Sequence, residues 1–188
     1  MATSKSNNSE KKAAVSKKTG KIKSKKDAAK NLGDLYEDGL KDIYWAEKEL
    51  VKNLPKIEKN ATTDKLNKAI SKHLKETILH IERLDLCFDE INLKPKAEKC
   101  DAMAGLLEEA KGLMEETEIG AVRDAAIIAA AQKVEHYEIA TYGTLAAFAK
   151  VLGYKNGLAL ILKTLKEEKK CDEGLSALAD TNLNSKAE

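Results

Sequence analysis

Aromatic residues make up only 4% of this 188-residue chain, which also has just two prolines and ten glycines. An all-β protein needs aromatic and β-branched residues and frequent turn signals, so this scarcity argues against that class. Helix-forming and apolar residues dominate instead, chiefly Ala, Leu, Lys, Glu and Ile. No uncharged run approaches the roughly 20 apolar residues of a membrane span, so we expect no association with membranes.

Cysteine is scarce as well, and the three cysteines, Cys87, Cys100 and Cys171, lie far apart in the sequence. There is no CxxC motif and no local Cys/His cluster, which argues against a zinc site built on thiolates. An odd number of widely spaced cysteines also gives no sign of a disulfide framework. We therefore expect a reducing, cytoplasmic setting.

The charge is unevenly distributed along the chain. Residues 1–30 hold ten lysines against Glu10 and Asp27, a net charge of +8 within a total of +2, which leaves −6 for residues 31–188. Apolar residues are few and scattered in this first segment, so we expect a disordered, Lys-rich tail. It either keeps the protein soluble or acts as a weak electrostatic arm for nucleic acid, without aromatics to stack on bases.

From Asn31 onward the hydrophobic pattern is helical, and residues 31–180 read as one bundle domain followed by a flexible C-terminus at 181–188. Thr62, Thr63 and Asp64 can cap a helix start, and Gly153 can end a helix. A connection of about 27 residues, long enough for a crossover, separates the second and third long helices. The pattern predicts four long helices and one short helix in the crossover, over residues 32–60, 64–92, 120–152, 157–180 and 101–116.

Each apolar stripe of the first, third and fourth long helices is interrupted by acids near its middle. The stripes follow alternating spacings of three and four, which is the pattern that faces a bundle core. The interrupting residues are Glu47 in the first stripe, Glu135 and Glu138 in the third, and Glu168 and Asp172 in the fourth. In the second helix a polar row of His73, Glu76 and His80 runs beside the stripe of Leu66, Ile70, Thr77, Ile81, Leu84, Phe88 and Ile91.

These polar groups also agree in height. All four sets lie near the middle of their helices, so a rise of about 1.5 Å per residue places them within roughly one turn of a common plane. Ionised carboxylates buried together would be costly. They could take up protons, pair with a cation such as Arg83, or bind metal ions, since carboxylates and imidazole suit iron or manganese.

At these residues the sequence resembles a known family. The segments that carry the resemblance are DIYWAEKELVKNLPKI (42–57), HLKETILHIERL (73–84), CDAMAGLLEEA (100–110), DAAIIAAAQKVEHYEIATYGTL (124–145) and LKEEKKCDEGL (165–175). They are similar to the YciE/YciF-like bacterial stress proteins of the ferritin-like superfamily. The resemblance implies an all-α, ferritin-like four-helix bundle, a homodimer, and a bacterial cytoplasmic location.

The wider ferritin-like pattern also implies a ligand set for two iron or manganese ions. Its order is Glu, Glu-x-x-His, Glu and Glu-x-x-His on successive helices. The chain departs from it, because Glu76 and His80 are four residues apart and the fourth helix has no histidine. The predicted metal ligands are nonetheless Glu47, Glu76, His80, Glu135, Glu138, Glu168 and Asp172.

Three neighbouring residues have open roles. His136 lies about 100° around the helix from Glu135 and is either a supporting donor or a residue packed near the short helix. Tyr142 either donates a hydrogen bond to a carboxylate or is an ordinary core aromatic. Cys100, at the start of the short helix, is either redox-active or a buried structural thiol.

Two functions are consistent with the sequence. The first is a di-metal stress protein that handles iron, oxygen or peroxide. The second is a non-enzymatic, dimeric stress or interaction protein whose polar core layer holds no metal. In either case the acidic layer is the feature to be explained.

The Lys-rich tail generates a separate prediction. If it binds DNA, deletion of residues 1–30 abolishes retention of DNA in a low-salt mobility-shift assay, and binding by the intact chain fades steeply with salt. Absence of DNA retention by the intact chain at low salt would rule this role out.

Overall fold

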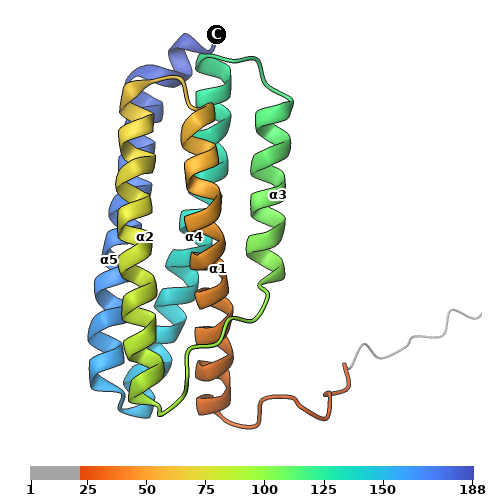
Figure 1. Cartoon of the computed structure of the whole chain (residues 1–188), viewed down its shortest axis with the longest axis vertical. Helices are drawn as coiled ribbons and strands as arrows, with labels where there is room; N and C mark the ends of the chain where they lie inside the picture. Colours follow the sequence, from red (N-terminus) through yellow and green to blue (C-terminus); the bar gives the residue numbers. More distant parts are fainter. Residues whose placement is uncertain (1–21) are drawn as a thin grey trace, which may run out of the picture.

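The computed structural model describes residues 22–188, apart from the side chains of residues 181 and 182. Most of the predicted Lys-rich tail, residues 1–21, lies outside this range. Within the described range all regular secondary structure is helical (Figure 1). The five α-helices are α1 (Leu32–Asn60), α2 (Asp64–Glu90), α3 (Asp101–Glu115), α4 (Ala121–Leu152) and α5 (Lys155–Leu178).

The four long helices form a bundle in which each helix packs against two others. Helix α1 contacts α2 and α4, and α5 closes the ring by contacting the same two helices. Helices α2 and α4 therefore lie diagonally opposite and run in the same direction (Figure 1). The long connection between them contains α3, which packs on α4 and α1. This arrangement confirms the all-α, ferritin-like four-helix bundle with a short helix in its crossover.

The helix ends largely follow local sequence signals. Asn31 caps α1, because its side chain accepts a hydrogen bond from the backbone N–H of Asp34 at 3.0 Å. Gly153 ends α4 in the left-handed conformation at φ 79°, which glycine adopts without steric cost. Helix α2 ends at Glu90, two residues before the predicted end, and Asn92 then turns the chain with φ 57°.

The start of α2 differs from the prediction in how it is capped. Thr63 occupies the N-cap position but makes no side-chain cap hydrogen bond. Instead the backbone N–H groups of Thr62 and Thr63 donate to Asp124 of α4, at 2.7 and 3.0 Å. Asp124 is fully buried. The carboxylate of Asp124 therefore caps the start of α2, a role that the sequence assigned to the side chains of Thr62, Thr63 and Asp64. This contact also links the α1–α2 turn to α4.

A second carboxylate holds the start of α5 in the same way. Glu90 of α2 accepts hydrogen bonds from the backbone N–H groups of Asn156 and Gly157, at 3.1 and 2.6 Å. A Cβ at position 157 would lie 2.8 Å from a Glu90 oxygen, so glycine is needed for this close approach. These two contacts fix the axial register of the helices and thus the height of the residues inside the bundle.

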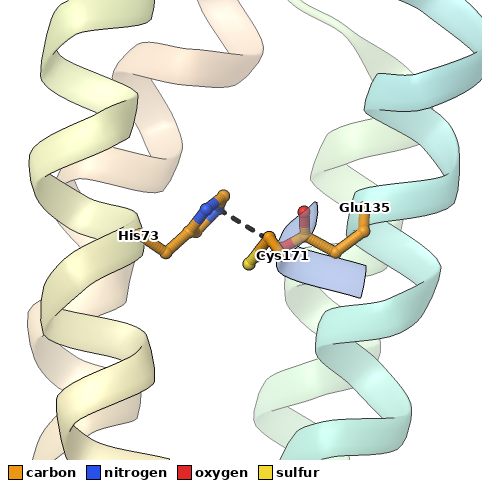
Figure 2. A group of neighbouring side chains, drawn as sticks. All are labelled: His73, Glu135 and Cys171. Carbon is orange, nitrogen blue, oxygen red and sulfur yellow. Dashed lines mark hydrogen bonds and ion pairs between the residues drawn. The ribbon is translucent and has the colours of Figure 1, made fainter. Parts of the chain in front are cut away.

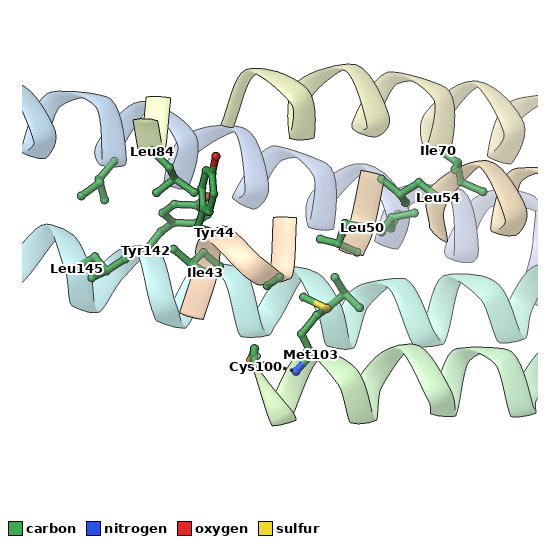
Figure 3. Close-up of a cluster of buried hydrophobic side chains, with 14 of the residues drawn as sticks. Ile43, Tyr44, Leu50, Leu54, Ile70, Leu84, Cys100, Met103, Tyr142 and Leu145 are labelled. Atoms are coloured by element: carbon green, nitrogen blue, oxygen red, sulfur yellow. Dashed lines mark hydrogen bonds between the residues drawn. The ribbon is translucent and has the colours of Figure 1, made fainter. Parts of the chain in front are cut away.

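The core consists of apolar layers on either side of a polar one. Ile43, Leu84 and Leu145 pack toward one end, and Leu54 and Ile70 toward the other (Figure 3). All five are less than a tenth exposed. The predicted stripes thus face inward, and the acids that interrupt them are carried into the interior by the apolar residues around them.

No helix in the described range is both long and apolar enough to cross a membrane. Beyond α5 the chain forms a π-helical turn, η1 (Ala179–Leu183), and a 3₁₀ turn, η2 (Asn184–Lys186). Leu183 is buried against the core. Flexibility of residues 181–188 stays a prediction.

Asp124→Ala should lower the free energy of unfolding by about 2–4 kcal/mol, because two buried backbone donors lose a charged acceptor. Urea unfolding of the full chain measures this change. Glu82→Ala, at an exposed position on α2, is the control and should change stability by less than about 0.5 kcal/mol. Equal effects of the two substitutions would contradict the structural role of Asp124.

Candidate metal centre

Five of the seven predicted ligands meet in the interior of the bundle. They come from all four long helices, and each is at most 1% exposed: Glu47 on α1, His80 on α2, Glu135 and Glu138 on α4, and Glu168 on α5. The shared mid-helix height inferred from the sequence is what brings them together. The metal-binding role of each residue stays a prediction.

The other two predicted ligands lie elsewhere. Glu76 is at the edge of the inward face of α2, and its carboxylate pairs with Lys72 Nζ at 2.6 Å. Asp172 lies between α4 and α5, where it accepts a hydrogen bond from Gln132 at 3.1 Å. Neither belongs to a group of buried atoms close enough to share an ion among the described residues. Helical spacing put them near the stripes, but their side chains turn to local partners.

His73 joins the centre although it was left out of the predicted ligand set. It is 5% exposed and lies on the same face of α2 as His80, seven residues away. The buried row of α2 includes Ile70, His73, Thr77, His80 and Leu84. The polar row noted in the sequence is therefore part of the core face itself. The two-turn spacing of the histidines was the signal that could have identified His73.

The buried ligand atoms form two groups on either side of Glu168. The first consists of Glu47, His80 and Glu168, with His80 Nδ1 lying 2.8 Å from Glu168 Oε1 and 3.3 Å from Glu47 Oε1. The second consists of His73, Glu135, Glu138 and Glu168. In each group the ligand atoms lie within 4.8 Å of one another. Glu168 belongs to both groups.

Several of these atoms have no hydrogen-bond partner within the described part of the chain. Both oxygens of Glu138, both of Glu168 and both ring nitrogens of His73 are in this state, as are one oxygen each of Glu47 and Glu135. Buried polar groups are normally satisfied, and an unsatisfied one costs about 1–3 kcal/mol, more when it is charged. So many unsatisfied ligand-type atoms in one place are typical of a site built for a cation.

A hydrogen-bonded chain holds His80 in position. Its Nε2 lies 3.1 Å from Glu167 Oε2, and Arg83 grips the same carboxylate through two hydrogen bonds at 2.5 and 3.1 Å. Arg83 also donates to Thr164 at 3.0 Å. The sequence suggested Arg83 as a cation that could pair with the central acids. In the structure Arg83 pairs with Glu167 instead. With Nε2 directed at Glu167, Nδ1 faces the centre.

The structure also shows the surroundings of Tyr142, His136 and Cys100, whose roles the sequence left open. Tyr142 donates a hydrogen bond to Glu47, which is the first of the two roles predicted for it. His136 is 69% exposed and lies 3.4 Å from Asp172, away from the centre. Cys100 is buried at the start of α3, where its sulfur accepts a hydrogen bond from the backbone N–H of Met103.

Burial and mutual repulsion give the central carboxyl groups unusual proton affinities in the metal-free protein. Burial, reinforced by the charge of Glu168, raises the pKa of both Glu135 and Glu138 well above the usual range. Burial also acts to raise the pKa of Glu168, but the contact with His80 outweighs burial and lowers the Glu168 pKa. Glu135 and Glu138 therefore keep their protons to higher pH than Glu168, which is the most readily ionised of the three.

The two histidines respond in opposite directions. Burial would lower the pKa of His80, but the close contacts of its Nδ1 with the carboxylates of Glu168 and Glu47 outweigh burial and raise this pKa to about 10. Burial lowers the pKa of His73, because the nearby acids only partly compensate for lost hydration. His73 is therefore neutral at physiological pH, with one ring nitrogen offering a lone pair, which is the form that binds metals.

Four helices, a crossover helix and inward carboxylates with imidazoles define a ferritin-like carboxylate bundle. The chain belongs to the family described as a domain of unknown function, DUF892, whose model matches residues 31–188. It is 51% identical over 160 residues to Protein YciF of Escherichia coli K12, covering 85% of this chain and 96% of the relative. The predicted membership of the YciF-like stress protein family is confirmed.

Solved structures give the same result. The crystal structure of the E. coli stress protein YciF matches with a TM-score of 0.80 and 49% identity, covering 83% of this chain and 99% of that one. YcfI from Rhodopseudomonas palustris, described as a candidate structural protein, matches with a TM-score of 0.75 and 42% identity, covering 78% and 94%. A protein from Xanthomonas campestris, 18% identical with a TM-score of 0.65 over 82% and 94%, shares the fold.

Chelator-treated protein should lose stability as the pH rises from about 7 to about 9.5. The folded pKa of His80 lies above its unfolded value of about 6.5, so its contribution is complete below pH 6.5 and is lost toward pH 10. The raised pKa of Glu138 acts with the same sign. Each such group contributes a slope of at most about 1.4 kcal/mol per pH unit.

Urea unfolding at several pH values measures this slope. Glu138→Gln should make it shallower, since the amide mimics the protonated acid and cannot ionise, whereas Glu82→Gln on the surface should leave it unchanged. A metal-free stability that is constant or rises over this range would contradict the assigned proton affinities.

Proposed function

We propose that this YciF-like stress protein binds two ions of iron or manganese in the middle of its bundle. The ligands would be the two groups of buried atoms defined above, with Glu168 shared between them. Glu76 and Asp172 of the predicted set would lie outside both groups, held by Lys72 and Gln132. The proposal extends the family assignment, which by itself describes a stress protein without a stated activity.

The single observation that carries the proposal is the carboxylate of Glu138. It is fully buried, and neither of its oxygens has a hydrogen-bond partner in the described structure. As an ion it would cost several kcal/mol to hold there. A divalent cation beside it would satisfy both oxygens and those of its neighbours.

The donor set fits this interpretation. Four carboxylates and two imidazoles are the ligands that iron and manganese take in carboxylate bundles, where they project inward from facing helices. The Glu167–His80 contact resembles the carboxylate–histidine pairing that orients metal ligands. Tyr142 holds one oxygen of Glu47 and leaves the other free.

When bound, iron or manganese in such a site offers open coordination positions to dioxygen or peroxide. The residues of the chain prepare those positions. Leu50, Leu54, Ile70 and Leu175 line an apolar pocket that reaches His73 and Glu135. Its wall keeps bulk water from the ligands, which strengthens their attraction for a cation. We therefore propose that the protein handles iron, oxygen or peroxide, as a cytoplasmic homodimer.

Protein purified from iron- or manganese-supplemented cultures should contain about two ions per chain by inductively coupled plasma mass spectrometry. Glu168→Ala should reduce this to less than about half an ion, because Glu168 belongs to both groups. Glu76→Ala should leave it near two, since Glu76 pairs with Lys72 outside the centre. Carefully loaded wild-type protein with less than about a tenth of an ion per chain would refute the proposal.

Glu135→Leu tests the alternative of a metal-free polar layer. If no metal binds, the substitution removes a buried acid and raises the thermal unfolding temperature. If metal binds, the loaded protein loses stability because bound ions stabilise the folded state. The sign of the change, measured by differential scanning calorimetry on loaded protein, distinguishes the two functions.

A further inference from the structure

The thiol of Cys171 lies at the edge of the centre, where neither group of oxygen and nitrogen ligands includes it. Its Sγ donates a hydrogen bond to Glu135 Oε1 at 3.3 Å, and His73 Nε2 lies 3.4 Å from the same oxygen. The sulfur, the carboxylate oxygen and the imidazole nitrogen all lie within 4.8 Å of one another. Figure 2 shows the three side chains converging from α2, α4 and α5.

His73 supplies an independent sign that this spot accepts a ligand. Its side chain is 6% exposed, and neither ring nitrogen has a hydrogen-bond partner in the described part of the chain. The ring points toward Glu135 and Cys171 (Figure 2). A buried imidazole without a partner is costly, and a cation between these three groups would remove that cost.

The other two cysteines have no such surroundings. Cys100 Sγ contacts the Tyr137 hydroxyl at 3.1 Å, and Cys87 Sγ faces the backbone carbonyl of Gly157 at 4.0 Å. Neither belongs to a group of potential ligands among the residues described. Cys171 is therefore the thiol that the fold brings to the centre, and it lies three residues after Glu168 on the same face of α5.

We propose that Cys171, His73 and Glu135 form a mixed thiolate, imidazole and carboxylate position that favours a zinc-like cation, Zn²⁺ or Co²⁺. This inference rests on the proposed metal centre, because His73 and Glu135 are ligands of that centre. It deepens the proposal by assigning a metal-ion preference to one of the two positions. Thiolate is a soft ligand that selects zinc and related ions, whereas carboxylates and water suit manganese. The group that contains Glu47 and His80 has oxygen and nitrogen ligands alone.

Binding at this position needs no oxidant or reductant. The cation takes the place of the thiol proton and of the proton on Glu135, so the S–H and O–H bonds break, metal–sulfur and metal–oxygen bonds form, and both protons pass to water. Glu135, which accepts the hydrogen bond from the thiol in the metal-free protein, then becomes a second ligand. The ion keeps its oxidation state and the overall charge balances.

Titration of the chelator-treated full chain with Co²⁺ tests this assignment by absorption spectroscopy. A thiolate ligand gives an intense near-ultraviolet charge-transfer band, while oxygen and nitrogen ligands give weak visible bands alone. We expect the intense band in the wild type, its loss in Cys171→Ser and Cys171→Ala, and its retention in the matched control Cys100→Ser. Zn²⁺ affinity should fall about tenfold or more in Cys171→Ser, with Mn²⁺ affinity nearly unchanged.

The possible failures are distinguishable. Co²⁺ bound at the stoichiometry found by mass spectrometry, but without the intense band in the wild type, overturns the role of Cys171 and leaves the di-metal proposal intact. Absence of any bound Co²⁺, iron or manganese overturns both. Circular dichroism of Cys171→Ser and Cys171→Ala confirms folding, and a band that survives in both folded variants also overturns the assignment.

Discussion

The structure depends on one electrostatic constraint, the burial of four carboxylates and two imidazoles within the middle turns of a helical bundle. Groups of this kind are costly in an apolar interior, and like charges raise the cost further. In the metal-free protein part of the cost is relieved by protons on Glu135 and Glu138 and by the pairing of His80 with Glu168. The unsatisfied atoms that remain are the ones that the proposed cations would satisfy.

The rest of the fold keeps this cluster in place. Asp124 and Glu90 hold the ends of neighbouring helices through backbone amides, so the helices cannot slide relative to one another. Apolar layers above and below enclose the polar one (Figure 3). Arg83 and Glu167 orient His80 from outside. Stability is thus concentrated around the centre, and the centre itself is the least satisfied part of the molecule.

The family relationship and the site complement each other. Likeness to the E. coli stress protein YciF extends over nearly the whole of that protein, so the bundle is shared as a complete unit. The family description states no activity. The inward carboxylates give the fold a chemical interpretation that the description lacks, and Cys171 adds a soft donor that would distinguish one position from the other.

The sequence by itself determined the helices, their inward faces and the height of the acids, because a period of 3.6 residues fixes which side chains share a face. Glu47, Glu135, Glu138 and Glu168 were predictable on this basis. The spacing of His73 from His80 and of Cys171 from Glu168 allowed these two residues to join them, but the tertiary structure decided that they do, while Glu76 and Asp172 turn to Lys72 and Gln132. Those choices depend on helix rotation and on partners from other helices, and neither is encoded in the spacing along one helix.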